Sequence, residues 1–321
     1  MTEQKTEILV TGTSGFIGEA LCPFLEKEHY TVTKASIRDL ADIDKIDFTN
    51  ITTVIHLAAL VHRRIKLAIA KNLKWLYNSH QMQGAPDSAY MRSNFELTKA
   101  LADKAKKSGV KKFIFMSTVA VYGLSSATYK LDERTQTNPA SAYGKSKLFA
   151  EQYLQEINSD DFKINVLRLP LVYGYGAKGN FGKFLSFHAK ARLIPFKDIH
   201  AIRTMIYVKN LCGLISRLVL YNGPKTVFIA TDNNDYSIEQ FSKLLFTGLQ
   251  AQRKVFFVKM PRLLQIILKK LKPKIYQQLF EDLIFDGTNT SKELGYKVPY
   301  NCENAIKETC KWYLSEQKKN Q

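Results

Sequence analysis

The sequence has few cysteines and no long apolar run, and these absences exclude several classes of protein. Its four cysteines are scattered without any C-x-x-C spacing, so neither a zinc site nor a disulfide framework is indicated (Cys22, Cys212, Cys302 and Cys310). No run of about eighteen apolar residues occurs, so no membrane-spanning helix is expected. Residues 2–7 are polar and unlike a signal peptide. We therefore predict a cytoplasmic protein that needs no metal.

Acidic residues are also scarce. Asp and Glu number 29 against 47 Lys and Arg, which leaves a formal net charge of +18. Such an excess favours an anionic partner, such as a nucleotide, an acidic lipid surface or nucleic acid, although a lysine-rich solubilising surface explains it as well. The chain has no recognised nucleic-acid motif and no ordered interleaving of aromatic and basic residues, so nucleic acid is not expected.

A glycine-rich stretch near the start of the chain carries the first chemical signal. Gly12, Gly15 and Gly18 are spaced G-x-x-G-x-x-G, after the apolar run 8–10 and before apolar residues at helical spacing. A strand, a glycine turn and a helix N-terminus in this order bring backbone N–H groups close to a pyrophosphate. An ordinary strand–turn–helix without a ligand is the alternative, but the context favours a dinucleotide site.

Strand and helix patterns then alternate. Apolar strands are expected over 31–37, 53–59 and 112–118, and a helix over 93–107. This alternation predicts an α/β fold with a Rossmann-type doubly wound parallel sheet. We expect a NAD(P)-binding domain over 1–172 and a smaller C-terminal α/β substrate domain over 173–321, with later segments returning to the first domain.

Two polar features of these strands bear on the cofactor and on catalysis. At the end of the strand over 31–37, the chain offers Ser36 and, two residues on, Arg38, where NAD-preferring sites place an Asp or Glu. A hydroxyl and a guanidinium suit a 2′-phosphate, so NADP(H) is favoured and NAD(H) stays open. His56 lies within the strand over 53–59, and we interpret it as a packed core histidine rather than a catalytic one.

A tyrosine and a lysine supply the catalytic signal. Tyr143 and Lys147 are four residues apart at the start of an apparent helix and so share a face. A free phenol has a pKa of about 10, and a neighbouring ammonium together with an oxidised nicotinamide favours the phenolate. The strand ending in Ser117 and Thr118 precedes this helix. A surface helix with a snorkelling lysine is the alternative reading of the pair.

Together these motifs resemble the extended short-chain dehydrogenase/reductases. The resemblance rests on residues 11–18, 56–59, 117–123, 143–147 and 167–174. Within this superfamily, residues 174–181 and 203–211 are most similar to UDP-glucose 4-epimerase-like proteins that include reductases of UDP-4-keto-6-deoxy-N-acetylhexosamines. Such enzymes make precursors of surface polysaccharide.

The resemblance implies a role for each matching residue. Thr118 would hydrogen-bond the C4 oxygen of the sugar, Tyr143 would be the acid/base there, and Lys147 would bind the nicotinamide ribose. Cofactor contacts are implied for Gly12, Ser14, Gly15, Phe16, Ile17, Ser36, Arg38, Asp42, Ile43, Leu57, Ala58, Ala59, Asn94, Tyr143, Lys147, Pro170 and Val172.

Contacts with a UDP-sugar are implied for Thr118, Asn180, Phe181, Phe196 and Arg203, of which Arg203 would pair with the diphosphate. Phe196 is equally compatible with core packing. Two departures from the branch stand out. No second arginine occurs near 280–290, and the segment from 56 to 94 is longer than usual.

Three functions stay open on the sequence alone. The first is reduction of a UDP-4-keto sugar by NADPH. The second is a 4-epimerase or dehydratase that retains NAD, although Val119 and Ala120 after Thr118 argue against dehydration. The third is a non-catalytic sensor or scaffold, which the presence of both Tyr143 and Lys147 disfavours. A homodimer is compatible with each.

The C-terminal third is more mixed. A strand is expected over 226–230, and a helix over 237–248 with Ser237 as its N-cap. The apolar and basic stretch 262–271 is either a core helix with lysine ends, which we favour, or a helix on an anionic membrane surface. Residues 62–90, basic and dotted with aromatics, form either a cover over the site or a surface insertion.

Overall fold

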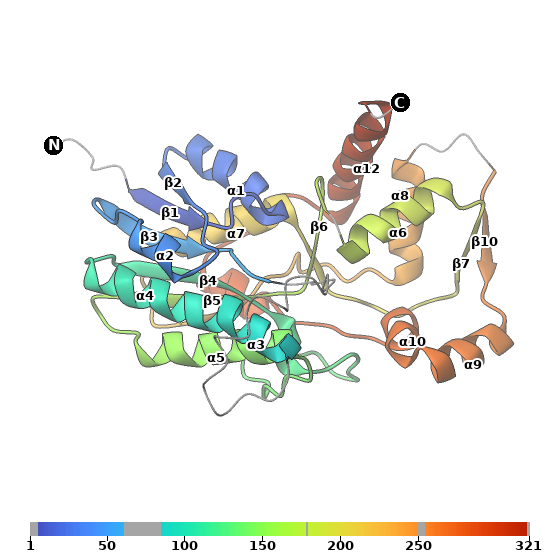
Figure 1. Cartoon of the computed structure of the whole chain (residues 1–321). Helices are drawn as coiled ribbons and strands as arrows, with labels where there is room; N and C mark the ends of the chain where they lie inside the picture. The colour runs from blue at the N-terminus through green and yellow to red at the C-terminus, as the bar shows by residue number, and fades with distance from the viewer. Residues whose placement is uncertain (1–5, 61–84, 178, 250–253, 320–321) are drawn as a thin grey trace.

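A six-stranded parallel sheet forms the centre of the molecule (Figure 1). The computed structural model describes residues 6–60, 85–177, 179–249 and 254–319. In the order β2-β1-β3-β4-β5-β9, the strands are β1 (Glu7–Thr11), β2 (Thr31–Ala35), β3 (Ile51–His56), β4 (Lys112–Thr118), β5 (Lys163–Leu169) and β9 (Val227–Ile229). Every neighbouring pair in it is parallel. The predicted doubly wound α/β fold is confirmed.

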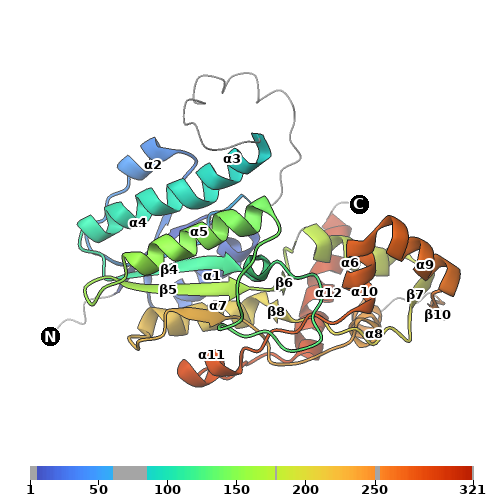
Figure 2. The ribbon, with the colours of Figure 1, turned by 90° about the horizontal axis from the view of Figure 1, so that it is seen from below.

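Helices cover both faces of this sheet because successive side chains of each strand point to opposite faces. The helices of this domain are α1 (Phe16–Lys27), α2 (Leu40–Asp44), α3 (Ala85–Met91), α4 (Leu97–Lys107), α5 (Ala142–Glu156) and α7 (Val208–Leu220). Ile8 and Val10 of β1 belong to a core with α1 and α7, whereas Leu9 belongs to a second core with α4 and α5. Figure 2 shows α4 and α5 side by side along that second face.

A smaller lobe follows the sheet. Two short parallel pairs belong to it, β6 (Leu171–Tyr173) with β8 (Met205–Tyr207) and β7 (Leu193–Lys197) with β10 (Phe256–Lys259). The later helices are α6 (Gly179–Lys190), α8 (Ile238–Gly248), α9 (Arg262–Leu271), α10 (Pro273–Phe280), α11 (Thr288–Glu293) and α12 (Cys302–Lys319). Ser237 caps α8 in a capping box with Gln240, which confirms the expected N-cap.

Several boundaries differ from the sequence prediction, and the strand expected over 31–37 ends at Ala35. The strand expected over 53–59 ends at His56, and residues 57–59 leave the sheet. The helix expected over 93–107 is α4 preceded by a π-helical turn, η2 (Arg92–Glu96). Such a turn inserts one residue into the helical repeat and reorients the side chains before it. Asn94 of this turn is completely buried.

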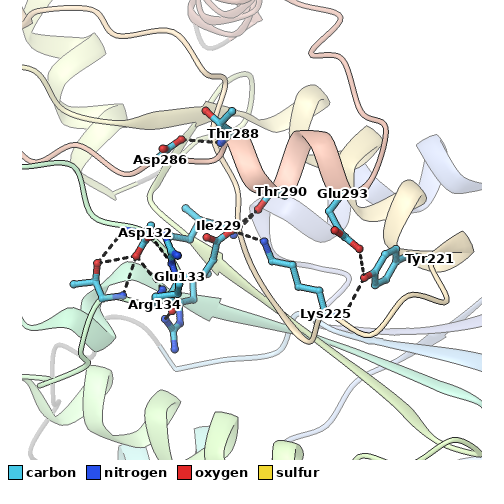
Figure 3. Close-up of polar contacts among 12 residues, drawn as sticks. Asp132, Glu133, Arg134, Tyr221, Lys225, Ile229, Asp286, Thr288, Thr290 and Glu293 are labelled. Carbon is cyan, nitrogen blue, oxygen red and sulfur yellow. Dashed lines mark hydrogen bonds and ion pairs between the residues drawn. The ribbon is translucent and has the colours of Figure 1, made fainter.

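Late segments of the chain form hydrogen bonds with the loop between β4 and α5. The Glu133 carboxylate accepts hydrogen bonds from Lys225 Nζ at 2.9 Å and from Thr290 Oγ1 at 3.1 Å (Figure 3). The same Thr290 oxygen accepts the backbone N–H of Ile229, in β9, at 3.0 Å. Edge strand β9 and helix α11 therefore pack with the six-stranded sheet although both follow residue 172.

Helix α9 corrects one expectation. None of its residues is buried, and Leu263 and Leu271 are 68% and 72% exposed. The favoured prediction that residues 262–271 pack into the core is wrong, because α9 lies on the surface of the smaller lobe beside α10. Among the described residues, no helix combines the length and apolarity needed to cross a bilayer.

Candidate active site

The residues singled out by the sequence gather where the parallel strands end. Thr11, His56, Thr118 and Leu169 are the last residues of β1, β3, β4 and β5. Parallel neighbours place their carboxyl ends at one edge of the sheet, which is where open α/β sheets bind ligands. The smaller lobe begins at this edge, because β6 follows β5 after the single residue Pro170.

The glycine loop between β1 and α1 is shaped for close backbone approach. Gly12 has φ of 73°, and a Cβ there would lie 2.6 Å from the backbone nitrogen of Ala58. A Cβ on Gly18 would lie 2.5 Å from the carbonyl oxygen of Gly12. Only glycine fits either position. Helix α1 begins at Phe16 with no side-chain hydrogen bond from its N-cap Gly15, so its first N–H groups face the loop.

The loop between β2 and α2 lies beside the glycine loop, because Ala35 at the end of β2 pairs with Thr11 at the end of β1. Ser36 and Arg38 are exposed there. The Arg38 backbone N–H donates to the Asp42 carboxylate at 2.9 Å, a bond that lowers the pKa of Asp42. Asp42 is thereby held at the start of α2, and the next residue, Ile43, is buried in the core.

His56 is a core histidine, as predicted. Its Nδ1 lies 2.7 Å from Thr11 Oγ1 and its Nε2 3.0 Å from Thr98 Oγ1. Because the Thr98 hydroxyl donates to the Asn94 carbonyl at 2.8 Å, it accepts the proton of Nε2, and Nδ1 accepts from Thr11. Burial lowers the pKa of His56 to about 3. The ring therefore stays neutral and ties β1, β3 and α4 together.

A pH-dependent loss of stability follows from this histidine. Its pKa in the folded chain lies below the ordinary histidine value of about 6.5, so the unfolded chain binds the proton first as the pH falls. Between pH 7 and pH 5 we expect about 2 kcal/mol of unfolding free energy to be lost through His56. Urea unfolding of His56→Gln at both pH values should show a loss smaller by that amount. Exposed His200→Gln is the control, and an unchanged loss in His56→Gln would contradict the assignment.

Asn94 holds the loop after β3 against helix α5. Its Oδ1 accepts the Leu60 N–H at 2.7 Å, and its Nδ2 donates to the Leu60 carbonyl at 3.1 Å. The same Nδ2 donates to Ser146 Oγ at 3.1 Å, whose hydroxyl donates to the Tyr143 carbonyl. Through this buried amide, the half-buried residues 57–59 and the turn that carries Tyr143 keep a fixed separation. The implied cofactor contact of Asn94 stays a prediction.

Thr118 and Tyr143 face each other. Thr118 ends β4 and accepts the Ala120 N–H at 3.2 Å, and Ser141 caps α5 by accepting the Gly144 N–H at 3.0 Å. Burial raises the pKa of Tyr143 to about 12, and the Thr118 hydroxyl beside it counteracts part of this effect. The structure thus joins the predicted hydroxyl and phenol at the carboxyl end of β4.

Lys147 lies one turn further along α5 and is 1% exposed. Its Nζ donates to the Met116 carbonyl at 2.8 Å and lies 4.3 Å from the centroid of the Phe115 ring. Burial lowers the pKa of Lys147 to about 7, against the opposing effect of Glu151. Burial is the main cause of the raised pKa of Tyr143, and the lowering expected from Lys147 together with an oxidised nicotinamide stays a prediction.

A buried ion pair beneath Lys147 was missed by the sequence analysis. Glu151 accepts Arg168 Nη2 at 2.7 Å, and it also accepts the Ser117 hydroxyl. Arg168 Nη1 donates to the Tyr122 hydroxyl at 2.9 Å. Two features of the sequence could have indicated this pair. Glu151 follows Lys147 by four residues, and Arg168 is the single arginine within the buried strand β5.

The predicted substrate residues have different environments. Asn180 is exposed in the first turn of α6. Phe181 is 1% exposed and packs against Tyr173 with 5.7 Å between ring centroids, so its side chain belongs to the core. Phe196 is 7% exposed and stacks on Phe184, which agrees with the core-packing alternative. The predicted substrate contacts of Phe181 and Phe196 are disfavoured, because both rings are buried.

Arg203 and the residues after β5 complete the set. Arg203 Nη1 donates to the carbonyls of Ser125 and Glu281, at 2.8 and 3.2 Å. Pro170 is buried, and Val172 is half-buried within β6. Most of the segment 62–90 lies outside the described residues, but Tyr90 of α3 meets Tyr143 edge-on at 6.3 Å between centroids.

Comparison with known proteins gives consistent matches. The model of the NAD dependent epimerase/dehydratase family matches residues 8–230. UDP-glucose 4-epimerase of Vibrio cholerae is 27% identical over 96% of this chain and 95% of its own. GDP-6-deoxy-D-talose 4-dehydrogenase of Aggregatibacter actinomycetemcomitans is 30% identical over 74% of this chain and 79% of its own.

Among solved structures, UDP-glucose 4-epimerase of Thermotoga maritima with UDP-glucose superposes with a TM-score of 0.71. It is 22% identical, and the alignment covers 97% of this chain and all of the other. This similarity concerns the fold, and it matches the Rossmann-like sheet and the smaller lobe described above.

Proposed function

Because the chain belongs to the NAD dependent epimerase/dehydratase family, and is thus a nicotinamide-dependent enzyme, we propose that it reduces the C4 ketone of a UDP-4-keto-6-deoxy-N-acetylhexosamine. The observation that carries the proposal is the placement of Tyr143 in the first turn of α5, with Lys147 one turn further along, beside the Thr118 that ends β4. The product would serve surface polysaccharide synthesis.

The nucleotide-binding domain fits a dinucleotide. In the glycine loop between β1 and α1, a Cβ at Gly12 or Gly18 would clash with nearby backbone atoms, so the backbone there stays open to a ligand. The start of α1 offers N–H groups to a pyrophosphate. Gly12, Gly15 and the first turn of α1 would hold the phosphates, and Lys147 the nicotinamide ribose. When bound, the dinucleotide supplies the hydride for the carbonyl carbon.

Tyr143 supplies the proton. A phenol with its pKa raised to about 12 is protonated at neutral pH, which suits a group that begins the reaction as an acid. The carbonyl carbon gains hydride, the C4 oxygen takes the proton of Tyr143, and the C=O double bond becomes C–OH. Thr118 orients the same oxygen, while Arg203 and Asn180 would meet the diphosphate.

The relatives support chemistry at C4. One is named a 4-dehydrogenase and another a 4-epimerase. Dehydratases of the superfamily usually carry Asp-Glu after the threonine, where this chain has Val119 and Ala120. A 4-epimerase that retains NAD is the second candidate, because the Vibrio cholerae epimerase aligns over nearly the whole chain.

Ser36 and Arg38 favour a replaceable NADPH over a retained NAD. Both are exposed at the end of β2, where a guanidinium can meet a 2′-phosphate. We expect wild type to prefer NADPH to NADH, and Arg38→Ala to lose this preference by about tenfold or more. The ratio of kcat/KM for the two coenzymes measures it. If the ratio of kcat/KM for NADPH to that for NADH is the same in wild type and in Arg38→Ala, Arg38 no longer supports the proposal that the protein is an NADPH-dependent reductase.

The proposal is tested by absorbance at 340 nm. Purified protein should oxidise NADPH when given a UDP-4-keto-6-deoxy-N-acetylhexosamine, with one NADPH consumed per ketone. Interconversion of UDP-N-acetylglucosamine and UDP-N-acetylgalactosamine with NAD, without net oxidation, would instead make the protein an epimerase. Failure of both, with NAD(P) still bound, would favour a sensor or scaffold.

A further inference from the structure

Helix α9 presents an apolar face that the rest of the described chain does not cover. Leu263, Leu264, Ile267 and Leu271 are 68%, 53%, 42% and 72% exposed. At 3.6 residues per turn these four side chains lie on one side of the helix. We call them the α9 face. A continuous exposed face of this kind on a folded domain marks an interaction surface rather than a chance excess of apolar residues.

The α9 face lies at one end of the molecule. In both views α9 lies at the outer end of the smaller lobe, together with β10 and on the side away from α2 (Figure 1, Figure 2). Tyr276 and Phe280 of α10 stack on each other at 4.9 Å between centroids. The two helices contact each other, so α10 supports α9 from one side and leaves the α9 face free to approach a flat partner.

The chain segment that carries the α9 face has charges of one sign. Residues 254–280 contain seven Lys and Arg and no Asp or Glu. Lys259 pairs with Asp198 at 3.3 Å, whereas Lys269 and Lys270, in the last turn of α9, have no ion pair within the described residues. A helix with Leu and Ile on one side and Lys and Arg around it suits the boundary between acyl chains and anionic headgroups.

We propose that the α9 face docks the protein on an anionic lipid bilayer. The apolar side chains enter the headgroup region, and the lysines contact lipid phosphates. Charge complementarity selects this partner over a second copy of the chain. Two α9 faces brought together would bring two strongly basic segments against each other, whereas an acidic bilayer attracts each basic residue near its surface.

Docking brings the bilayer close to the candidate substrate site. Glu281, the residue after α10, accepts a hydrogen bond from Arg203 through its carbonyl. The end of the docking element therefore contacts the arginine that we assign to the diphosphate. Only this consequence rests on the proposed function; the docking itself does not.

The test is flotation of the full chain with vesicles in a density gradient at physiological salt. We expect co-flotation with vesicles of equal parts phosphatidylcholine and phosphatidylglycerol, and little with phosphatidylcholine alone. Leu263→Glu/Leu271→Glu and Lys269→Glu/Lys270→Glu should each weaken binding by about tenfold or more. Leu220→Glu, at a residue 60% exposed on α7, is the matched control and should float as wild type does.

Each outcome decides the proposal. The two double variants should keep wild-type near-ultraviolet circular dichroism and thermal unfolding, which separates docking from folding. Equal flotation with neutral and anionic vesicles, or double variants that float like wild type, would overturn the inference. So would a wild-type dimer in sedimentation that Leu263→Glu/Leu271→Glu converts to monomer, because the face would then belong to a second copy. None of these readouts requires turnover, so failure of the proposed reaction stays distinguishable.

Discussion

Tyr143→Phe is expected to lower kcat about a thousandfold while leaving the fold and coenzyme binding in place. The substitution removes one oxygen atom from a half-buried ring whose hydroxyl partner is Thr118. The ring itself remains, with its edge-on contact to Tyr90. Single-turnover oxidation of NADPH at saturating keto sugar isolates the chemical step, and coenzyme binding is followed separately by fluorescence.

The expected size of this effect follows from the proton balance. Reduction of a ketone leaves an alkoxide unless an acid donates as hydride arrives. Among the described residues, Tyr143 is the acidic side chain that Thr118 holds at the end of β4. His56, the nearest alternative in the sequence, is neutral, completely enclosed and hydrogen-bonded on both ring nitrogens. It therefore has no free proton to offer a substrate.

Tyr153→Phe provides a matched control on the same helix. The Tyr153 hydroxyl donates to Asp103 on α4, away from the strand ends. Its removal costs about 1 kcal/mol of stability or less and should leave kcat unchanged. Equal losses in Tyr143→Phe and Tyr153→Phe would point to helix packing and contradict an acid role for Tyr143. Full activity of Tyr143→Phe would do so directly.

The sequence predicted the parts of the site that local chemistry fixes. The glycine spacing predicted a turn that only glycine fits, and Gly12 with its positive φ confirms this. The four-residue spacing of Tyr143 and Lys147 placed both on one side of α5. The apolar strands predicted the parallel sheet, since buried parallel strands are apolar on both faces.

Features that depend on tertiary packing were beyond prediction. Helix α9 has a composition that fits a core helix as well as a surface one, and only the arrangement of the smaller lobe leaves it exposed. Phe181 follows Asn180 directly, yet the rotation of about 100° per residue in α6 directs its ring into the core. The lowered pKa of Lys147 depends on burial against Met116 and Phe115, which are far from it in sequence.

The pair of Glu151 and Arg168 is the strongest such case, and it leads to the second large expected effect. Both side chains are buried, at 1% and 5% exposure, and they make three hydrogen bonds to each other. Arg168→Met would leave a carboxylate in the core without its partner. We expect a loss of about 3–5 kcal/mol in the free energy of unfolding, measured by urea denaturation at pH 7.

Two further variants separate pairing from simple loss of contacts. Arg168→Met/Glu151→Leu removes both charges and should recover much of the stability, because the cost of Arg168→Met lies in the unpaired carboxylate. The side chains of Lys130 and Asp235 form an ion pair and are 59% and 38% exposed. Lys130→Met breaks this exposed pair and should lower the free energy of unfolding by about 1 kcal/mol or less. A loss in Arg168→Met no larger than in Lys130→Met would contradict the argument.

The same variants test whether the pair positions the catalytic helix. Glu151 contributes to the pKa of Lys147 from one turn away and accepts the hydroxyl of Ser117 beside Thr118. If the pair holds this arrangement, the double variant should regain stability without regaining kcat, because neither Leu nor Met bonds Ser117. Recovery of both together would assign the pair to stability alone. Glu151 and Arg168 would then stabilise the fold without positioning Lys147. The hydrogen bond to the Met116 carbonyl would be the contact that positions Lys147.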